Sequence, residues 1–539
     1  MHRHHAQDGA RNAGRRGDSP PAGLGATAAT IETMLDRAAR PRWPDQSGFI
    51  VAALGATLGL GAFTSFPARA LAHGGGAFLV AYLIAVATAA LPVLVLEFGV
   101  GQCYQASAPE GLRRLDRRLE WLGWWACGLA ALAALANAAQ LAWTGLYAVD
   151  SLVALVANRP LPWGAEVQGA GVWFSQRLHE PVGDTGGLAA LAPVGGPVVV
   201  LALVWLLLHR VMAGGVASIG RWCLWSVPAA VALLVALGVG VLYQPGAVDG
   251  AAAYLMPRWS ALSEGATWLG AYREAFATHA LGLGVYVAYA SHLKRGADAS
   301  GSAAVVALAG AAFAFLAGLV ACAAAGALAA RADVPLDAVI LAGPRAIFAA
   351  FPAFIAGLDL PAWGSALMAL LLFLDWFVLA TGTIIGLVAA VTLAVADKWN
   401  LPWRWLNARL CLAGFFASLI LATTRGPQLV EILHEGLFPF GVAVAVAAQC
   451  LALARVSGGR NLQRHLNAYS VIAVGRGWRA MVAAVTPVAL LGVAVDGVFR
   501  LASADTLLPW QAAAAGAVAG MVALAAALSL AVLPGRRIL

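Results

Sequence analysis

Two short glycine-rich segments carry the residues best suited to bind a solute and an ion. Residues 55–61 read GATLGLG, and residues 278–284 read THALGLG. Glycine alternates with leucine at the end of both, over residues 58–61 and 281–284, and this alternation favours an unwound backbone. An interrupted helix offers free carbonyl groups to a cation and free N–H groups to an anion. These segments therefore predict a site for a small anionic or zwitterionic solute coupled to a cation.

Three ionisable residues, Glu97, Glu274 and His279, lie within or at the border of apolar segments. An ionisable side chain inside a membrane is costly unless it is paired, so each is a candidate charge or proton site. A structural role stays open for each of them. Glu97 can satisfy backbone groups at a broken helix, Glu274 beside Arg273 can lie at the surface, and His279 can be a hydrogen-bonding scaffold residue.

The composition requires that membrane helices position these residues. Of the 539 residues, 61% are hydrophobic and 11% are charged, and the mean hydropathy is +0.79. Soluble domains carry about 25% charged residues, which excludes a water-soluble protein of this size. A membrane-crossing helix needs about 20 apolar residues, and twelve segments qualify. They fall near 47–71, 77–100, 121–149, 188–209, 222–243, 267–292, 301–330, 361–395, 403–424, 432–454, 478–498 and 509–533.

The two glycine-rich segments interrupt the first and sixth of these spans. Interrupted helices at corresponding places in two halves are typical of transporters built from inverted repeats. We therefore expect an all-α integral membrane protein with 12 transmembrane helices, of which helices 1 and 6 are discontinuous. Its expected parts are a cytoplasmic N-terminal tail (1–42), helices 1–5 (43–243), helices 6–10 with external loops (244–455), and helices 11–12 with a short cytoplasmic C-terminus (456–539).

The basic residues predict the orientation in the membrane. The net charge is +8, but the 34 Lys and Arg residues lie in short loops and not on one basic face, so no nucleic-acid partner is expected. In alternate loops, 25 fall on the side of the N-terminus and 8 on the other side, and Arg69 lies within the first span. The positive-inside rule then predicts a multi-pass protein of the cell membrane with both termini cytoplasmic.

Motifs of other function classes are missing from the sequence. The six cysteines have no CxxC or Cys/His spacing, which argues against a metal centre or a disulfide framework. The sequence lacks HExxH, GxSxG and a phosphate-binding loop, and it has no channel filter motif. We therefore expect a carrier and not an enzyme or a channel.

The stretch from Trp43 to Gly101 resembles the neurotransmitter:sodium symporter family, whose bacterial members include the leucine transporter. It holds the segments GATLGLGAFTSFP and GGGAF in the family order. Weaker similarity continues to about residue 455. The resemblance implies an inverted-repeat fold of the leucine-transporter type and sodium-coupled symport of an amino acid or related small zwitterionic solute by alternating access. Its expected partners are that solute and the lipid bilayer, and we expect a monomer or weak homodimer.

The resemblance also implies a substrate site at the two interruptions. The N–H groups of Leu60 and Gly61 would hold the substrate carboxylate. Gly59 stands where monoamine carriers have an acid, which implies a substrate that brings its own carboxylate. The further substrate positions that the resemblance implies are Thr57, Asn137, Ala277, Thr278, Ala280 and Gly282.

The ion sites implied by the resemblance are altered in this sequence. One Na+ site would use the carbonyl groups of Gly55 and Leu58 with Thr381 or Thr383, which remain alternatives. A second Na+ site is expected to be lost or rebuilt, because Ala62 and Gly310 stand where the family has Asn. No chloride is expected, since Glu274 can supply a fixed negative charge at the corresponding place.

The resemblance further places a cytoplasmic gate at Arg40 and Asp397. Two alternatives to sodium symport remain open. One is a carrier of the same fold coupled to protons through Glu274 or His279, and the other is a non-transporting sensor or scaffold. Intact glycine-rich segments favour the carriers.

Overall fold

The computed structural model describes residues 40–178, 193–339, 345–436, 441–455, 458–502, 520, 524 and 526–533. The chain divides into two units, Met1–Pro41 and Arg42–Leu539, and the second is described here. Most of the expected tail (1–42) and of helix 12 (509–533) lies outside the described residues. Within the described residues the fold is helical, and β-structure is limited to the isolated bridges Gly75–Pro257 and Pro193–Thr423.

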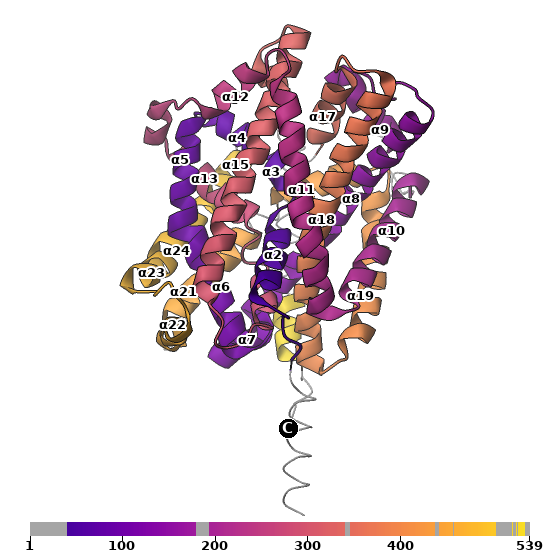
Figure 1. Ribbon diagram of the computed structural model, residues 1–539. Helices are drawn as coiled ribbons and strands as arrows, with labels where there is room; N and C mark the ends of the chain where they lie inside the picture. Colours follow the sequence, from indigo (N-terminus) through magenta and orange to yellow (C-terminus); the bar gives the residue numbers. More distant parts are fainter. Residues whose placement is uncertain are drawn as a thin grey trace, which may run out of the picture. The chain divides into compact units, whose positions relative to one another are not determined.

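The second unit consists of a series of helices that begins with α2 and ends with α24 at residue 502 (Figure 1). The first half contains α2 (Gln46–Thr57), α3 (Gly61–Thr64), α4 (Phe66–Ala72), α5 (Gly76–Ala85), the π-helix η1 (Val86–Ala90), α6 (Leu91–Tyr104), α7 (Ala108–Leu115), η2 (Arg117–Leu119), α8 (Glu120–Val156), α9 (Val167–Arg177), α10 (Gly195–Met212), α11 (Gly215–Leu242) and α12 (Ala247–Leu255). The second half contains η4 (Trp259–Ser263), α13 (Gly265–Thr278), α14 (Val285–Ala290), α15 (Ala299–Ala332), α16 (Leu336–Val339), α17 (Ile347–Ala356), α18 (Ala362–Trp399), α19 (Trp403–Ser418), η5 (Leu419–Ala422), α20 (Gly426–Gly436), α21 (Ala443–Arg455), α22 (Gly458–Tyr469), α23 (Arg476–Ala480), η7 (Met481–Val485) and α24 (Thr486–Ala502).

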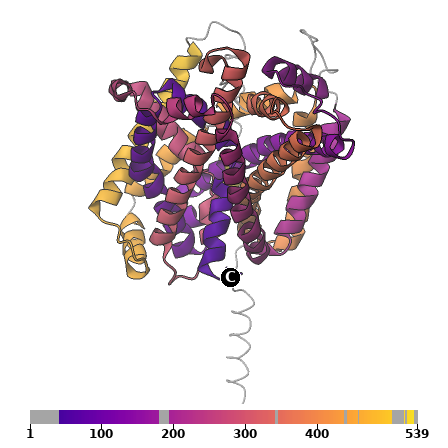
Figure 2. The same cartoon turned by 45° about the horizontal axis from the view of Figure 1, so that its top comes forward.

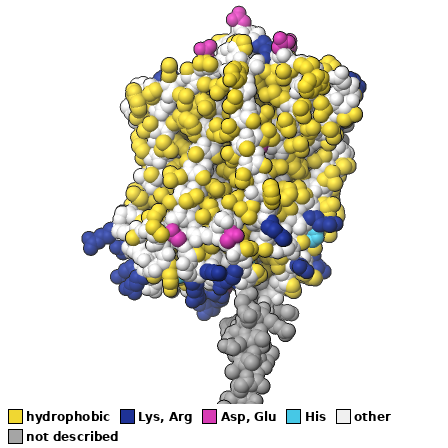
Figure 3. Space-filling view, in the orientation of Figure 1, with side chains coloured by type: hydrophobic (Ala, Val, Ile, Leu, Met, Phe, Trp, Pro, Cys, Tyr) yellow, Lys and Arg dark blue, Asp and Glu magenta, His cyan; other side chains and the backbone are white. Residues whose placement is uncertain are grey.

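Several helices are long and apolar enough to cross a membrane. The described residues contain 8 such helices, or 9 if α2 and the pair α3–α4 count as one bent span. A broad hydrophobic band covers the face in Figure 3, and most of the Lys and Arg side chains on this face lie along its lower edge. The protein is therefore a multi-pass membrane protein, as the composition predicts.

The helices surround α2 (Figures 1 and 2). It packs against α11, α15 and α18, while α8 and α18 pack along each other's length. On one side α13 packs against α5 and α24, and on the other α10 packs against α8 and α19. The interrupted ends of α2 and α13 thus lie among long helices, away from lipid.

The first interruption falls within the predicted segment 55–61. Asp45 caps α2 by accepting the N–H of Gly48 at 2.6 Å. The helix ends at Thr57, because Leu58 takes an extended conformation with ψ 91°. The chain becomes helical again at Gly61, and the axes before and after the interruption differ by 45°.

The second interruption separates α13 from α14 over residues 279–284. Three residues there have positive φ, namely Ala280 (47°), Gly282 (78°) and Gly284 (73°). Glycine adopts this conformation without a steric penalty, which explains two of the three. Ala280 is the exception, and a non-glycine residue at positive φ is held there by its surroundings.

Candidate functional site

A cavity of about 160 Å³ is lined by residues from both interruptions. Of the predicted substrate residues, Gly282 does not line it. Those that do are Thr57, Gly59, Leu60, Gly61, Asn137, Ala277, Thr278 and Ala280. The remaining wall comes largely from small or apolar side chains of α8, α15, α18 and α20, including Ala133, Ala136, Phe313 and Leu387.

Free backbone N–H groups are available on the α3 side of this cavity. The N–H groups of Gly59, Leu60 and Gly61 donate no hydrogen bond to any residue that the structure describes. The following turn is closed from Leu60, whose carbonyl accepts the N–H of Phe63 at 2.9 Å. Unpaired donors at the start of a helix attract an anion. This arrangement suits a carboxylate.

Free carbonyl groups are available at the end of α2. Within the described residues, the carbonyl groups of Gly55 and Thr57 accept no hydrogen bond beyond the helix. The carbonyl of Leu58 faces the hydroxyl of Thr383 at 3.4 Å. By contrast, Thr381 donates its hydroxyl to the carbonyl of Phe377 in its own helix at 2.7 Å. Thr383 is therefore the hydroxyl of α18 that faces the interruption.

Glu274 lies in a buried charged cluster at the cavity. Its carboxylate forms an ion pair with Nε of Arg69 at 2.6 Å and accepts the hydroxyl of Ser65 at 3.1 Å. Only 1% of the side chain is exposed. The surface interpretation of Glu274 is thus wrong, because a long-range partner on α4 balances its charge. Sequence analysis noted Arg69 within a span but did not connect the two.

Glu97 supports the second interruption directly. It is buried in α6, and its Oε1 accepts the N–H of Gly282 at 2.8 Å. Gly282 thus takes part in the site through its backbone, although it does not line the cavity. This contact agrees with the interpretation that Glu97 satisfies backbone groups at a broken helix.

His279 is the first residue after α13 and is fully buried. Its ring nitrogens lie near the carbonyl groups of Ala275 and Ala307. The residue does not contribute to the cavity wall.

Asp375 is a buried acid that sequence analysis missed. It lies in α18 with 2% exposure, and neither carboxylate oxygen has a hydrogen-bond partner among the described residues. The signal was present, since a single acid interrupts the apolar run LLLFLDWFVLA. An acid inside a membrane span marks a candidate functional position by default.

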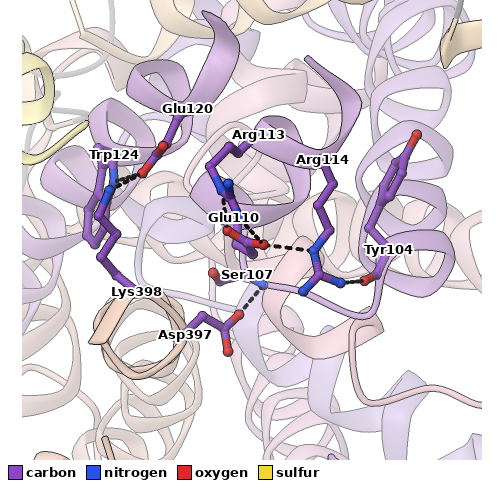
Figure 4. Close-up of polar contacts among 9 residues, drawn as sticks. All are labelled: Tyr104, Ser107, Glu110, Arg113, Arg114, Glu120, Trp124, Asp397 and Lys398. Carbon is purple, nitrogen blue, oxygen red and sulfur yellow. Dashed lines mark hydrogen bonds and ion pairs between the residues drawn. The ribbon is translucent and has the colours of Figure 1, made fainter. Parts of the chain in front are cut away.

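The predicted gate residue Asp397 lies near the end of α18 and contacts the loop between α6 and α7. Its carboxylate accepts the N–H of Ser107, in the loop between α6 and α7, at 2.7 Å (Figure 4). The adjacent Lys398 pairs with Glu120 of α8 at 2.5 Å. Arg40 belongs to the first unit of the chain, so the pair Arg40–Asp397 stays a prediction.

A second set of charges surrounds Glu110 of α7 (Figure 4). Its carboxylate pairs with Arg113 at 2.6 Å and with Arg114 at 2.8 Å. Partial burial raises the pKa of Glu110, but the hydrogen bonds from the two guanidinium groups outweigh it, and the net pKa is lowered.

The residues just before α2 form hydrogen bonds with α14 and with the loop after it. Arg42 donates to the carbonyl of Leu293 at 2.6 Å and also contacts Gln105. The indole N–H of Trp43 donates to the carbonyl of Tyr289 at 2.8 Å. Sequence analysis did not single out Arg42, because its partners, the Gln105 side chain and the Leu293 carbonyl, are far from it in the chain.

The described residues contain no group of three or more His, Cys, Asp or Glu side chains that could hold a metal ion. The oxygens gathered at the end of α2 are instead carbonyls and a hydroxyl. Such neutral oxygen ligands suit a hard, weakly bound cation.

Comparisons with known proteins agree with this geometry. The family model described as the sodium:neurotransmitter symporter family matches residues 40–185 and 176–534. An uncharacterized sodium-dependent transporter of Methanocaldococcus jannaschii is 28% identical over 84% of this chain and 89% of its own length. The creatine transporter of Torpedo marmorata is 26% identical over 84% of this chain and 78% of its own. The sodium- and chloride-dependent GABA transporter 2 of Mus musculus is 25% identical over 73% of this chain and 69% of its own.

The family match spans the bent first helix, the cavity and most of the remaining helices. Members of this family are transporters and not enzymes, in agreement with the sequence analysis. The chain belongs to the sodium:neurotransmitter symporter family and is a secondary active transporter.

Proposed function

We propose that the protein carries an amino acid or related small zwitterionic solute together with Na+ by alternating access. The observation that carries this proposal is that the N–H groups of Leu60 and Gly61, unpaired among the described residues, line the cavity, while the carbonyl groups left open at the end of α2 precede them directly in the chain. The first set suits a carboxylate, and the second suits a cation. A solute that supplies its own carboxylate also explains why Gly59 carries no acidic side chain.

The Na+ site in this proposal uses the carbonyl groups of Gly55 and Leu58 with the hydroxyl of Thr383. Oxygen ligands lie about 2.4 Å from a hard cation of this size, so two ligands at a right angle are about 3.4 Å apart. The oxygens of Leu58 and Thr383 are 3.4 Å apart. That separation is long for a hydroxyl hydrogen bond and suits two ligands of one ion. Thr381 remains the weaker alternative, because its hydroxyl is engaged within its own helix.

The proposal includes one Na+ and no chloride. Ala62 and Gly310 line the cavity without an oxygen-bearing side chain, so a second metal site lacks ligands there. The Glu274 carboxylate, which pairs with Arg69, would supply a fixed negative charge in place of the anion. Some relatives are named sodium- and chloride-dependent transporters, and this chain would differ from them in its anion requirement.

The solute is expected to be compact, with a carboxylate and a positive group. Creatine and GABA, the solutes in the names of two relatives, are zwitterions of this kind. Alanines at 133, 136, 277 and 280 make part of the cavity wall apolar and roomy. The proposal therefore favours amino acids with apolar side chains as the first compounds to test.

The remaining expectations on architecture belong to the same proposal. They are twelve membrane helices in two inverted repeats, discontinuous helices 1 and 6, and both termini in the cytoplasm of a cell-membrane monomer or weak homodimer. The charge distribution in Figure 3 supports the orientation, since Lys and Arg gather at the end where α2 begins. Asp397 and Arg40 would then form part of the cytoplasmic gate.

Uptake into proteoliposomes tests the proposal. Purified protein is reconstituted, and uptake of labelled amino acids, creatine and GABA is measured under a Na+ gradient alone and a proton gradient alone. We expect uptake that requires Na+ and that is abolished in Gly59→Asp and Leu60→Pro. Uptake driven by protons and indifferent to Na+ would establish the proton-coupled alternative. Binding without uptake would establish the sensor or scaffold.

A further inference from the structure

A basic groove lies between α22 and α23, apart from the candidate site. It has a volume of about 500 Å³, and the residues that line it are Arg460, Gln463, Arg464, Asn467, Ala468 and Arg479. Arg479 belongs to α23 and the others belong to α22. Half of the lining side chains are therefore guanidinium groups, and they approach the groove from two helices.

Hydrogen bonds fix the segment that joins these two helices. The side-chain amide of Asn467 donates to the carbonyl of Val474 at 3.0 Å and accepts its N–H at 2.7 Å. Gln463 donates to the same carbonyl at 2.7 Å. In α23, Trp478 donates its indole N–H to the carbonyl of Pro92 in α6 at 3.0 Å. The walls of the groove are thus held in place by the fold.

The helix α22 presents its arginines on the side away from α6. Leu462 and Leu466 are 0% exposed and lie against Gly99 of α6. Arg460 and Arg464 are each two residues from a buried leucine, which places them about 200° around the helix from it. Both arginines are exposed. The leucines therefore attach α22 to the protein, and the arginines stay available to a ligand.

No nearby acid balances these charges. Residues 455–480 contain five arginines and no Asp or Glu, and none of the three guanidinium groups in the groove forms an ion pair within the described part of the chain. Lys and Arg side chains gather in Figure 3 at the lower left, where Figure 1 places α22 and α23. Like charges one turn apart on a helix are destabilising. An anion in the groove would relieve this repulsion.

The groove lies at the depth of the lipid headgroups. Arg479 is in the first turn of the segment Arg476–Gly497, which is long and apolar enough to cross a membrane. Further along this segment the exposed side chains are apolar, as at Val488 with 72% and Val495 with 53% exposure. The end of a membrane-crossing helix lies in the headgroup region, where Trp residues such as the adjacent Trp478 are common. A charged groove and a surface for lipid tails thus adjoin each other.

We propose that this groove binds the headgroup of an anionic phospholipid, with its phosphate held between the arginines of α22 and Arg479. Guanidinium groups bind phosphate oxygens through pairs of parallel hydrogen bonds, and basic pockets beside membrane helices accept anionic headgroups. The acyl chains lie along the exposed apolar side of α24. This site is independent of the proposed solute and of the coupling ion.

Native mass spectrometry of the purified full-length protein measures this binding without any transport. Dioleoyl phosphatidylglycerol is titrated against dioleoyl phosphatidylcholine, which has the same chains but no net charge. We expect the anionic lipid to bind more tightly. In the double variant Arg460→Gln/Arg464→Gln its dissociation constant should rise about 30-fold, which is about 1 kcal/mol for each arginine removed. Equal binding of the two lipids to the wild type would overturn the proposal.

A second double variant, Arg117→Gln/Arg118→Gln, is the matched control. Both arginines are exposed in η2, which packs on α7, and α7 packs against α6 as α22 does. The two double variants lose the same charge, so a general attraction of the surface for anionic lipid would weaken equally in both. We expect the control to bind the lipid as the wild type does. Equal weakening in the two variants would contradict a specific site.

Crosslinking locates the lipid and distinguishes it from a free phosphate ion. Phosphatidylglycerol with a photoreactive group near its headgroup is bound to the wild-type protein, and the modified peptides are identified. We expect crosslinks within residues 460–479, which inorganic phosphate at the concentration of the lipid does not suppress. Crosslinks confined to other loops would overturn the proposal, and suppression by phosphate would show a site for the free ion. This readout on the wild type decides the proposal even if the groove variant does not fold.

Discussion

Thr383→Val is the substitution that tests the proposed Na+ site most directly. Valine keeps the shape of threonine and removes one oxygen, which lies 3.4 Å from the carbonyl of Leu58. A polar contact to a charged group contributes about 1.5–3 kcal/mol. At about 1.4 kcal/mol for each factor of ten, the half-saturating Na+ concentration should rise about 10- to 150-fold.

Thr381→Val is the matched control in the same helix. The Thr381 hydroxyl donates to the carbonyl of Phe377, four residues earlier. That carbonyl keeps its helical N–H partner after the substitution, so we expect a change of less than about threefold in half-saturating Na+. Both hydroxyls are buried, and each substitution removes one hydroxyl oxygen from α18. The difference between them therefore isolates the contact with α2.

Sodium titration of uptake and of thermal stability, at constant ionic strength with choline as the replacement, measures both variants. The stability titration needs no solute and reports Na+ binding by itself. Equal Na+ dependence of Thr383→Val and the wild type would refute the assigned ligand. A large shift in Thr381→Val with none in Thr383→Val would assign the site to the other threonine.

Two stability predictions follow from the same region. Gly282→Ala places a Cβ 2.0 Å from Cγ2 of Val446 at φ 78°, so the free energy of unfolding should fall by about 1–2 kcal/mol from the backbone alone and further from the overlap. Gly61→Ala is the control, because the space around its new Cβ is open, and it should leave the thermal midpoint unchanged. Equal midpoints for the two variants would contradict this prediction. Arg69→Gln leaves the buried Glu274 without its ion-pair partner and should lower the free energy of unfolding by about 3–5 kcal/mol. Adding Glu274→Gln should restore most of that stability. A double variant as unstable as Arg69→Gln would show that loss of the ion pair is not the cause.

The two interruptions could be predicted because their cause is local. Alternating glycine and leucine at the ends of segments 55–61 and 278–284 marks places where a helix gains little from continuing. The structure ends α2 at Thr57 and α13 at Thr278, both inside those segments. It also adds Ala280 at φ 47°, which no local pattern indicates, since alanine favours a helix.

The choice between Thr381 and Thr383 could not be made from the sequence. Residues two apart on an α-helix point about 200° apart, so only one of the two can face α2. Which one does depends on the rotation of α18 about its own axis, and this is set by packing along its whole length against α8 and α2. A one-residue uncertainty in alignment is enough to exchange them.

The sequence also could not predict which distant charged residues form an ion pair. Arg69 and Glu274 lie 205 residues apart, and each alone permits several roles. Asp375 shows the opposite case, since its position in an apolar run was visible but its surroundings were not. The sequence shows which polar residues enter the membrane, and the packing of distant helices decides which of them meet.

Under the proposed function, backbone groups would let so apolar a chain bind a charged solute. The free donors and acceptors belong to the interrupted first helix, and any residue type supplies such groups, so the sequence can keep alanine and glycine around much of the cavity. Arg273 and Glu274 also line the cavity, and its small side chains act mainly by volume. Substitutions such as Ala133→Leu should therefore narrow the range of accepted solutes without changing Na+ dependence, whereas changes at Gly59 or Thr383 should affect binding of every solute.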